Sequence, residues 1–171
     1  GSTAQTNAIR NGENTELYAV FPYRVYGLDK ANLIVATNSY NKRLFKGLGW
    51  ADWMQDAIQA AQMGLTAEAK MYTVYAMTNR EPLLKFPAFW REQNDYEPSE
   101  NNGAVAQDAL QRMIMQTSGK KIMLQPAWPA GWNASFKLNA PFNTVVQGMI
   151  SNGVIENLIV EQGWIIAMDR G

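Results

Sequence analysis

Three carboxylates lie close together in a stretch of the sequence that also carries aromatic side chains. Asp95, Glu97 and Glu100 follow Trp90, and Tyr96 lies between the first two of them. Hydrolysis of a glycosidic bond needs two carboxyl groups, one as an acid with a raised pKa and one as a base or nucleophile. Aromatic rings cover the apolar C–H face of a sugar, and acids or amides pair with its hydroxyls. The three acids are therefore candidate catalytic residues.

The same stretch also has an ordinary structural explanation. Asn101 or Asn102 can cap a helix that begins at Gly103, and acids just before a helix are favoured by its dipole. Taken alone, the stretch is more typical of such a cap than of an active site. Spacing in sequence does not give the separation of the carboxylates in space, so both explanations stay open.

Two further groups of tryptophans admit two interpretations each. Trp50, Trp53 and Asp56 lie on successive turns of an expected helix. In the functional interpretation, Trp50 flanks a sugar and Asp56 bonds a hydroxyl or a neighbouring Arg. In the structural interpretation, Trp53 is a core residue and Asp56 is an acid that the dipole of the first helical turn favours. Trp128 and Trp132 are either a stacking platform or, as such clusters more often are, a plug between two layers.

Composition excludes several kinds of chemistry. The 171 residues include no cysteine and no histidine, which removes disulfides, thiol nucleophiles, the Ser-His-Asp triad and the commonest zinc ligand. Fifteen basic and fifteen acidic residues cancel, so no electrostatic footprint for nucleic acid or an anionic membrane is present. No apolar run approaches the roughly 20 residues of a membrane span. Hydrolytic chemistry must then use carboxylates, or Lys or Tyr, and we expect no metal or organic cofactor.

The expected fold class is α+β, with helices in the first two thirds and strands in the last third. The residues from Leu17 to Tyr26 are interrupted by Pro22 and predict a turn or partial helix. Apolar spacing predicts helices over 30–42 (capped by Asp29), 50–63, 66–77 and 103–117, the middle two forming an antiparallel pair. Alternation predicts strands over 121–124, 136–139, 144–150, 154–161 and 164–168. Asn152-Gly153 is a strong hairpin signal.

Several segments, in order, resemble one family: the six-hairpin, (α/α)6-barrel glycosidases of the bacterial α-L-fucosidase-like kind. The similar segments are Glu16–Gly27, Gly49-Trp50, Gln55–Ala61, Phe86–Trp90 and, most closely, Gly103–Pro129. The resemblance covers about 14–161. In this family the last segment leads from the final barrel helix into a C-terminal β-domain.

The resemblance implies that this chain supplies the last barrel helices and the β-domain of a longer enzyme. The expected organisation is a poorly ordered polar segment (1–13), a helical region (14–118) and, where the period changes from 3.6 to 2, a β-sheet domain (119–171). The implied function is hydrolysis of a glycoside or oligosaccharide by a carboxylate pair, with Glu100, Glu97 or Asp95 as acid or base. Trp50, Asp56, Trp90 and Asn101 are then candidate sugar contacts.

The run Ser99-Glu100-Asn101-Asn102 departs from the family, in which an acid, often with a His, precedes the helix. The alternative is therefore a non-catalytic carbohydrate-binding or scaffold module that has lost its acids. A third possibility is an interaction domain without a sugar site. The resemblance implies a periplasmic or secreted location, although the chain begins without a signal peptide. A partial barrel exposes apolar helix faces, so we expect a homo-oligomer or association with an upstream barrel segment.

Overall fold

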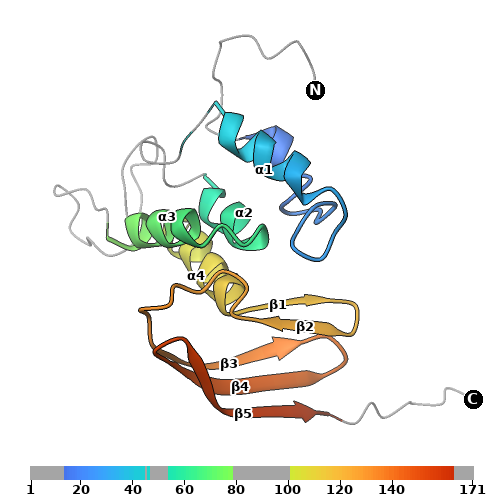
Figure 1. Ribbon diagram of the computed structural model, residues 1–171, viewed down its shortest axis with the longest axis vertical. Coiled ribbons are helices and arrows are strands. Elements are labelled where there is room, and N and C mark those ends of the chain that lie inside the picture. The colour runs from blue at the N-terminus through green and yellow to red at the C-terminus, as the bar shows by residue number, and fades with distance from the viewer. Residues whose placement is uncertain (1–13, 45, 47–53, 79–100, 164–171) are drawn as a thin grey trace, which may run out of the picture.

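The computed structural model describes residues 14–44, 46, 54–78 and 101–163, which form an α+β fold. Helices lie on one side of the molecule and two small antiparallel sheets on the other (Figure 1). The helical elements are a 3-10 turn at Thr15–Leu17, α1 (Leu33–Lys42), α2 (Asp56–Gln62), α3 (Thr66–Thr78) and α4 (Asn101–Ile114). The strands are β1 (Met115–Ser118), β2 (Lys121–Leu124), β3 (Ala134–Ala140), β4 (Thr144–Ser151) and β5 (Val154–Gln162). The predicted fold class is thereby confirmed.

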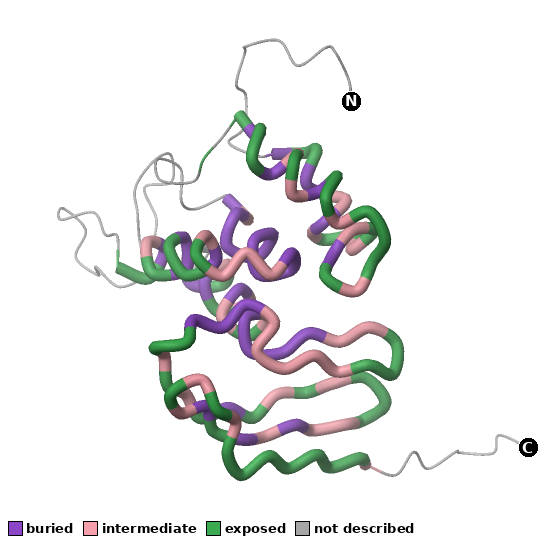
Figure 2. The backbone as a smooth tube through the Cα atoms, viewed as in Figure 1, coloured by how far each residue is buried: buried purple, intermediate pink, exposed green. Residues whose placement is uncertain are grey.

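Helix α2 is the centre of the helical layer. All seven of its residues are buried, because α3 and α4 pack against it (Figure 2). Its alanines at 57, 60 and 61 have small side chains that let neighbouring helices approach closely, and Ile58 packs into the core. Gly64, at φ 74, ends the helix, and Leu65 leads into α3. The predicted antiparallel pair is confirmed.

Three predicted helix starts were wrong. Helix α4 begins at Asn101, two residues before the predicted Gly103, so Asn101 and Asn102 belong to the helix and do not cap it at Gly103. Asp29 does not cap α1, since its carboxylate pairs with Arg24 and Lys30, and the helix begins three residues later at Leu33. Asn32 precedes that helix in the left-handed conformation, at φ 61. Met54 and Gln55 are not helical, so α2 begins at Asp56; residues 50–53 lie outside the described residues.

Helix α4 ends at Ile114, three residues earlier than predicted. The backbone N–H groups of Gln125 and Ala127 donate to the carbonyls of Ile114 (2.7 Å) and Met113 (3.3 Å). These bonds satisfy carbonyls that a helix end leaves without intrahelical partners. Met115 to Ser118 then pair with Leu124 to Lys121 as an antiparallel hairpin. The helix therefore passes directly into β1, because the returning chain donates hydrogen bonds to the last carbonyls of the helix.

The second sheet has the order β3-β4-β5 and confirms four of the predicted features. Strands β3, β4 and β5 cover the predicted ranges, and Asn152-Gly153 turns the chain with both φ values positive (48 and 79). Phe136 lies opposite Gly148, where an added Cβ would meet the ring at 3.3 Å. Beside this glycine the register of β4 and β5 shifts between Gln147 and Met149. The predicted strand at 164–168 lies outside the described residues.

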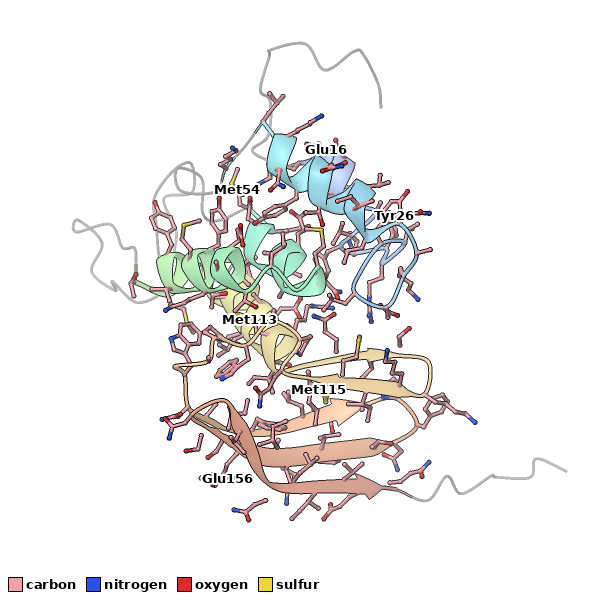
Figure 3. The ribbon with its side chains drawn as sticks, viewed as in Figure 1. Glu16, Tyr26, Met54, Met113, Met115 and Glu156 are labelled. Atoms are coloured by element: carbon pink, nitrogen blue, oxygen red, sulfur yellow. The ribbon has the colours of Figure 1, made fainter. Side chains whose placement is uncertain are left out.

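One continuous core joins the helices to the sheets. Met113 lies within the helical layer and Met115 at its junction with the hairpin (Figure 3). Phe136, Val146 and Ile150 contribute the sheet's inner face. The core face of the sheet is thus buried against the same cluster as the helices, whereas β5 is exposed along most of its length (Figure 2).

Candidate functional site

Most of the predicted site residues lie outside the described residues. Trp50 belongs to the segment 47–53, and Trp90, Asp95, Glu97 and Glu100 belong to the segment 79–100. Asn101 is the first residue of α4, and Asp56 is the first residue of α2. The geometry that the structure describes is therefore that of the helix ends to which these two segments connect.

Those helix ends lie together at one end of the helical layer. Segment 47–53 leads to the start of α2, while segment 79–100 runs from the end of α3 to the start of α4. A small cavity of about 10 Å³ is lined from all three helices, by Met54, Asp56, Ala57, Tyr72, Tyr75, Ala76 and Val105. The antiparallel order of the helices brings their ends together, although they are separated by up to about 45 positions in the sequence. Polar and aromatic groups gather at this end.

Asp56 is held in a buried cluster next to this cavity. Its carboxylate forms an ion pair with the guanidinium of Arg43, and both side chains are less than 5% exposed. Arg43 also donates to the carbonyl of Tyr40 (2.6 Å) and to the hydroxyl of Tyr72 (2.7 Å). The Tyr40 hydroxyl donates to the carbonyl of Asp56 (3.2 Å), and the guanidinium lies 3.7 Å from the Tyr40 ring centre. The cluster fixes the end of α1 against α2 and α3.

The two tyrosines of this cluster remain protonated over a wide pH range. Burial raises the pKa of Tyr40 far above its ordinary value of 10.0, and the positive charge of Arg43 opposes this only in part. Burial likewise raises the pKa of Tyr72, again against the opposing charge of Arg43. Both hydroxyls therefore act as hydrogen-bond donors or acceptors and not as bases near neutral pH.

Sequence reasoning named Asp56 but missed Arg43. The prediction allowed Asp56 to bond a hydroxyl or a neighbouring Arg, and the structure brings Arg43 to it from thirteen positions away. A signal for Arg43 does exist: Tyr40 and Arg43 are three residues apart at a helix end, where an Arg can stack on an aromatic ring. The sequence could not reveal that Tyr72 and Asp56 complete the cluster, because three different elements contribute to it.

The Trp128 and Trp132 pair lies at the seam of the two layers. Trp128 is 8% exposed and belongs to the core, and the two rings meet edge to face with centroids 5.5 Å apart. The Trp128 indole N–H donates to the carbonyl of Trp132 (2.9 Å). Lys70 of α3 lies 5.8 Å from the centre of the Trp132 ring. This arrangement fits a plug better than an open stacking platform.

No group of three or more His, Cys, Asp or Glu side chains in the described part of the chain is placed to hold a metal ion. No helix within the described ranges has both the length and the apolar character needed to cross a membrane.

Comparison with known proteins gives no family assignment. Neither a protein-family model nor a curated protein sequence matches this chain.

Proposed function

We propose that this chain is the terminal helical and β-sheet part of a glycoside hydrolase. The observation that carries the proposal is the meeting of the ends of α2, α3 and α4 around a cavity of about 10 Å³ whose lining includes Asp56 and two tyrosines. The two segments that hold the candidate acids and tryptophans both connect there. A carboxylate pair working on a sugar needs its residues gathered at one place, and the helix ends to which these segments connect lie together, which supports the proposal.

In this proposal the segment before α4 supplies the chemistry. Glu100, Glu97 and Asp95 are the candidates for acid or base, and Trp50, Trp90 and Asn101 are candidate sugar contacts. Asp56 has a supporting part, since its buried pairing with Arg43 sets the start of α2. The second carboxylate of the pair then comes from an upstream part of the enzyme, and the location is periplasmic or secreted.

The experiment that tests the proposal is turnover by the protein expressed from its complete reading frame. Hydrolysis of aryl glycosides is expected, with Glu100→Gln lowering kcat by about 10²- to 10⁴-fold, the usual contribution of a general acid or base. Glu156→Gln is the matched control, because Glu156 lies on exposed strand β5. Unchanged kinetics in Glu100→Gln, Glu97→Gln and Asp95→Asn would exclude this segment from catalysis.

A non-catalytic carbohydrate-binding or scaffold module is the second candidate. The observation that favours it is the run Ser99-Glu100-Asn101-Asn102, which departs from the family where an acid and often a His are expected. Saturable oligosaccharide binding by the complete protein, without turnover of any glycoside tested, would favour this candidate over the enzyme.

A further inference from the structure

A groove of about 630 Å³ lies where the β1–β2 turn, the β3–β4 turn and the end of β5 come together at one end of the molecule (Figure 1). The β1–β2 hairpin contributes Ile122 to its lining, the β3–β4 turn contributes Phe142, and β5 contributes Val160 and Gln162. Phe142 and Val160 are 49% and 55% exposed. The described residues therefore leave much of the apolar lining of this groove uncovered.

The groove lies on the core face of the three-stranded sheet. Val160 of β5 pairs with Val146, which is fully buried, and Gln162 pairs with Thr144. Paired residues of antiparallel strands project to the same face, and alternate residues of one strand share a face. Val160, Gln162 and Thr144 all line the groove, as this alternation requires. At the end of β5 the even-numbered residues thus face the groove.

The chain is still tied to the sheet at Gly163, the residue that follows β5. Its N–H donates to the carbonyl of Asn143 (2.8 Å), one position beyond the last pair of the β4–β5 register. Gly163 does not have a positive φ, and an added Cβ there would collide with the side chain of Asn143. The start of the next segment is therefore held against the β3–β4 turn, at the mouth of the groove.

The segment that follows has the composition to fill this groove. Residues 164–168, which lie outside the described residues, are all apolar and begin with Trp164. An extended chain that continues β5 places Trp164 on the same face as Val160 and Gln162 and places Ile165 on the opposite face. A tryptophan buries about 150–250 Å² of its surface. We propose that the segment 164–168 closes the groove, with the indole of Trp164 packed against Val160 and Ile122.

Covalent attachment favours this occupant over a molecule from solution. Trp164 is two residues from the lining residue Gln162, roughly 7 Å along an extended chain, so little chain has to be ordered for the indole to reach the groove. A free apolar ligand or a second copy of the chain loses translational and rotational freedom when it binds. A tethered segment avoids most of that loss, because its effective concentration at the groove is high.

Nuclear Overhauser measurements on the 171-residue chain test the proposal directly. Cross-peaks are expected between the indole protons of Trp164 and the methyl groups of Val160 and Ile122. The ring current of the indole should also move these methyl signals upfield. The variant Trp164→Phe assigns the indole signals, since it removes them.

Trp164→Ser and Ile165→Ser form a matched pair, because alternation sets the two side chains on opposite faces. Trp164→Ser should abolish the upfield shifts of Val160 and Ile122. It should also speed hydrogen exchange of the Gly163 amide at least about tenfold, since the burial that holds the end of β5 is lost. Ile165→Ser should keep the shifts and change this exchange rate by no more than about twofold. Thermal unfolding establishes that both variants remain folded.

Three results would overturn the proposal. The first is the absence of cross-peaks from Trp164 to Val160 and Ile122 in the wild-type chain. The second is an effect of Ile165→Ser equal to that of Trp164→Ser, which would mean that the segment does not continue the alternation of β5. The third is cross-peaks that arise only between differently labelled copies in a mixed sample, which would mean that a second copy fills the groove.

Discussion

The guanidinium of Arg43 and the carboxylate of Asp56 form an ion pair in the interior of the helical layer, with side chains 4% and 2% exposed. Burying two charges is expensive, and geometry of high quality is needed to offset that cost. Here Tyr40 and Tyr72 take up two further donors of the guanidinium. The pair therefore joins the end of α1 to α2 and α3 as one unit.

Removing one partner of this pair should destabilise the protein strongly. Arg43→Met leaves the Asp56 carboxylate buried without its cation, and the expected loss is about 3–5 kcal/mol in the free energy of unfolding. Lys42→Met, a neighbouring and exposed change, is the control, with an expected effect within about 0.5 kcal/mol. Urea unfolding followed by circular dichroism measures both.

The double variant Arg43→Met with Asp56→Leu separates the contribution of the ion pair to the free energy of unfolding from the cost of leaving one charge buried and unpaired. Replacing both ions by apolar groups is often close to neutral, so the double variant should be more stable than Arg43→Met alone. A double variant whose loss equals the sum of the two single losses contradicts this account, because independent sites add.

The carboxyl of Asp29 should make stability depend on pH in the acid range. Burial by itself raises the pKa of Asp29, but hydrogen bonds from Ser118 and Lys30 and the charge of Lys30 outweigh it, so the pKa lies below its ordinary value of 3.8. A lowered pKa means that the folded state binds fewer protons than the unfolded state. The resulting stabilisation is complete above about pH 4 and is lost as the pH falls through the lowered value.

Comparison of wild type with Asp29→Asn tests this dependence. The variant should be less stable at pH 7, and the difference should shrink as urea midpoints are taken down toward pH 2.5. Glu156→Gln, on the exposed strand β5, provides a control for loss of one negative charge. A difference between wild type and Asp29→Asn that stays constant from pH 7 to 2.5 would refute the interpretation.

Two glycines allow backbone strain to be separated from steric conflict. Gly64 and Gly119 both have positive φ (74 and 55). An added Cβ at Gly119 meets nothing within 4 Å, whereas at Gly64 it comes to 2.7 Å from a methyl group of Leu28. Gly119→Ala should cost about 1–2 kcal/mol from backbone conformation alone. Gly64→Ala should lower the free energy of unfolding by about 1 kcal/mol more than Gly119→Ala. This is the low end of the cost of overpacking, because Leu28 is partly exposed and can rotate away.

Thermal and urea unfolding of the two variants give this comparison directly. Adding Leu28→Ala to Gly64→Ala should remove the extra loss, since the conflicting methyl group is then absent. Equal losses in Gly64→Ala and Gly119→Ala would mean that Leu28 moves without cost.

Strand β5 should mediate association of two copies of the chain. Its outer edge is unpaired among the described residues, and Leu158, Ile159 and Val160 are 46%, 44% and 55% exposed. An antiparallel pairing of two β5 strands about Ile159 sets Leu158 opposite Val160 and Asn157 opposite Glu161. Ile159→Lys should then weaken the dimer at least tenfold in sedimentation velocity, because charged side chains oppose edge pairing.

Val25→Lys serves as the control for this prediction, since Val25 is 60% exposed in the N-terminal turn and far from β5 in the sequence. A wild-type chain that stays monomeric at about 100 µM, or dimerisation that Ile159→Lys leaves unchanged, would show that this edge does not pair with itself.

Strands β2 to β5 and the helix pair were predictable because their signals are local, whereas β1 covers residues that had been predicted as the end of a helix. Asn152-Gly153 allows the backbone of a tight hairpin, and alternation of apolar and polar residues in β3 sets which face is buried. Gly64 ends α2 for a similarly local reason, its positive φ. The errors were at helix ends where the polar groups have partners outside the helix. The Asp29 carboxylate pairs with Arg24 and Lys30, and the last carbonyls of α4 accept hydrogen bonds from Gln125 and Ala127.

The sequence by itself determined the fold class, the exclusion of thiol and histidine chemistry, and the residue types expected around a sugar. Only the tertiary structure decided that Arg43 neutralises Asp56, and that the side-chain amide of Gln116 donates to the carbonyl of Ala61 in α2. Each of these contacts joins elements far apart in the chain. Hydrophobic periodicity specifies which face of an element is buried, but the partner of a buried polar group is specified only when the elements pack.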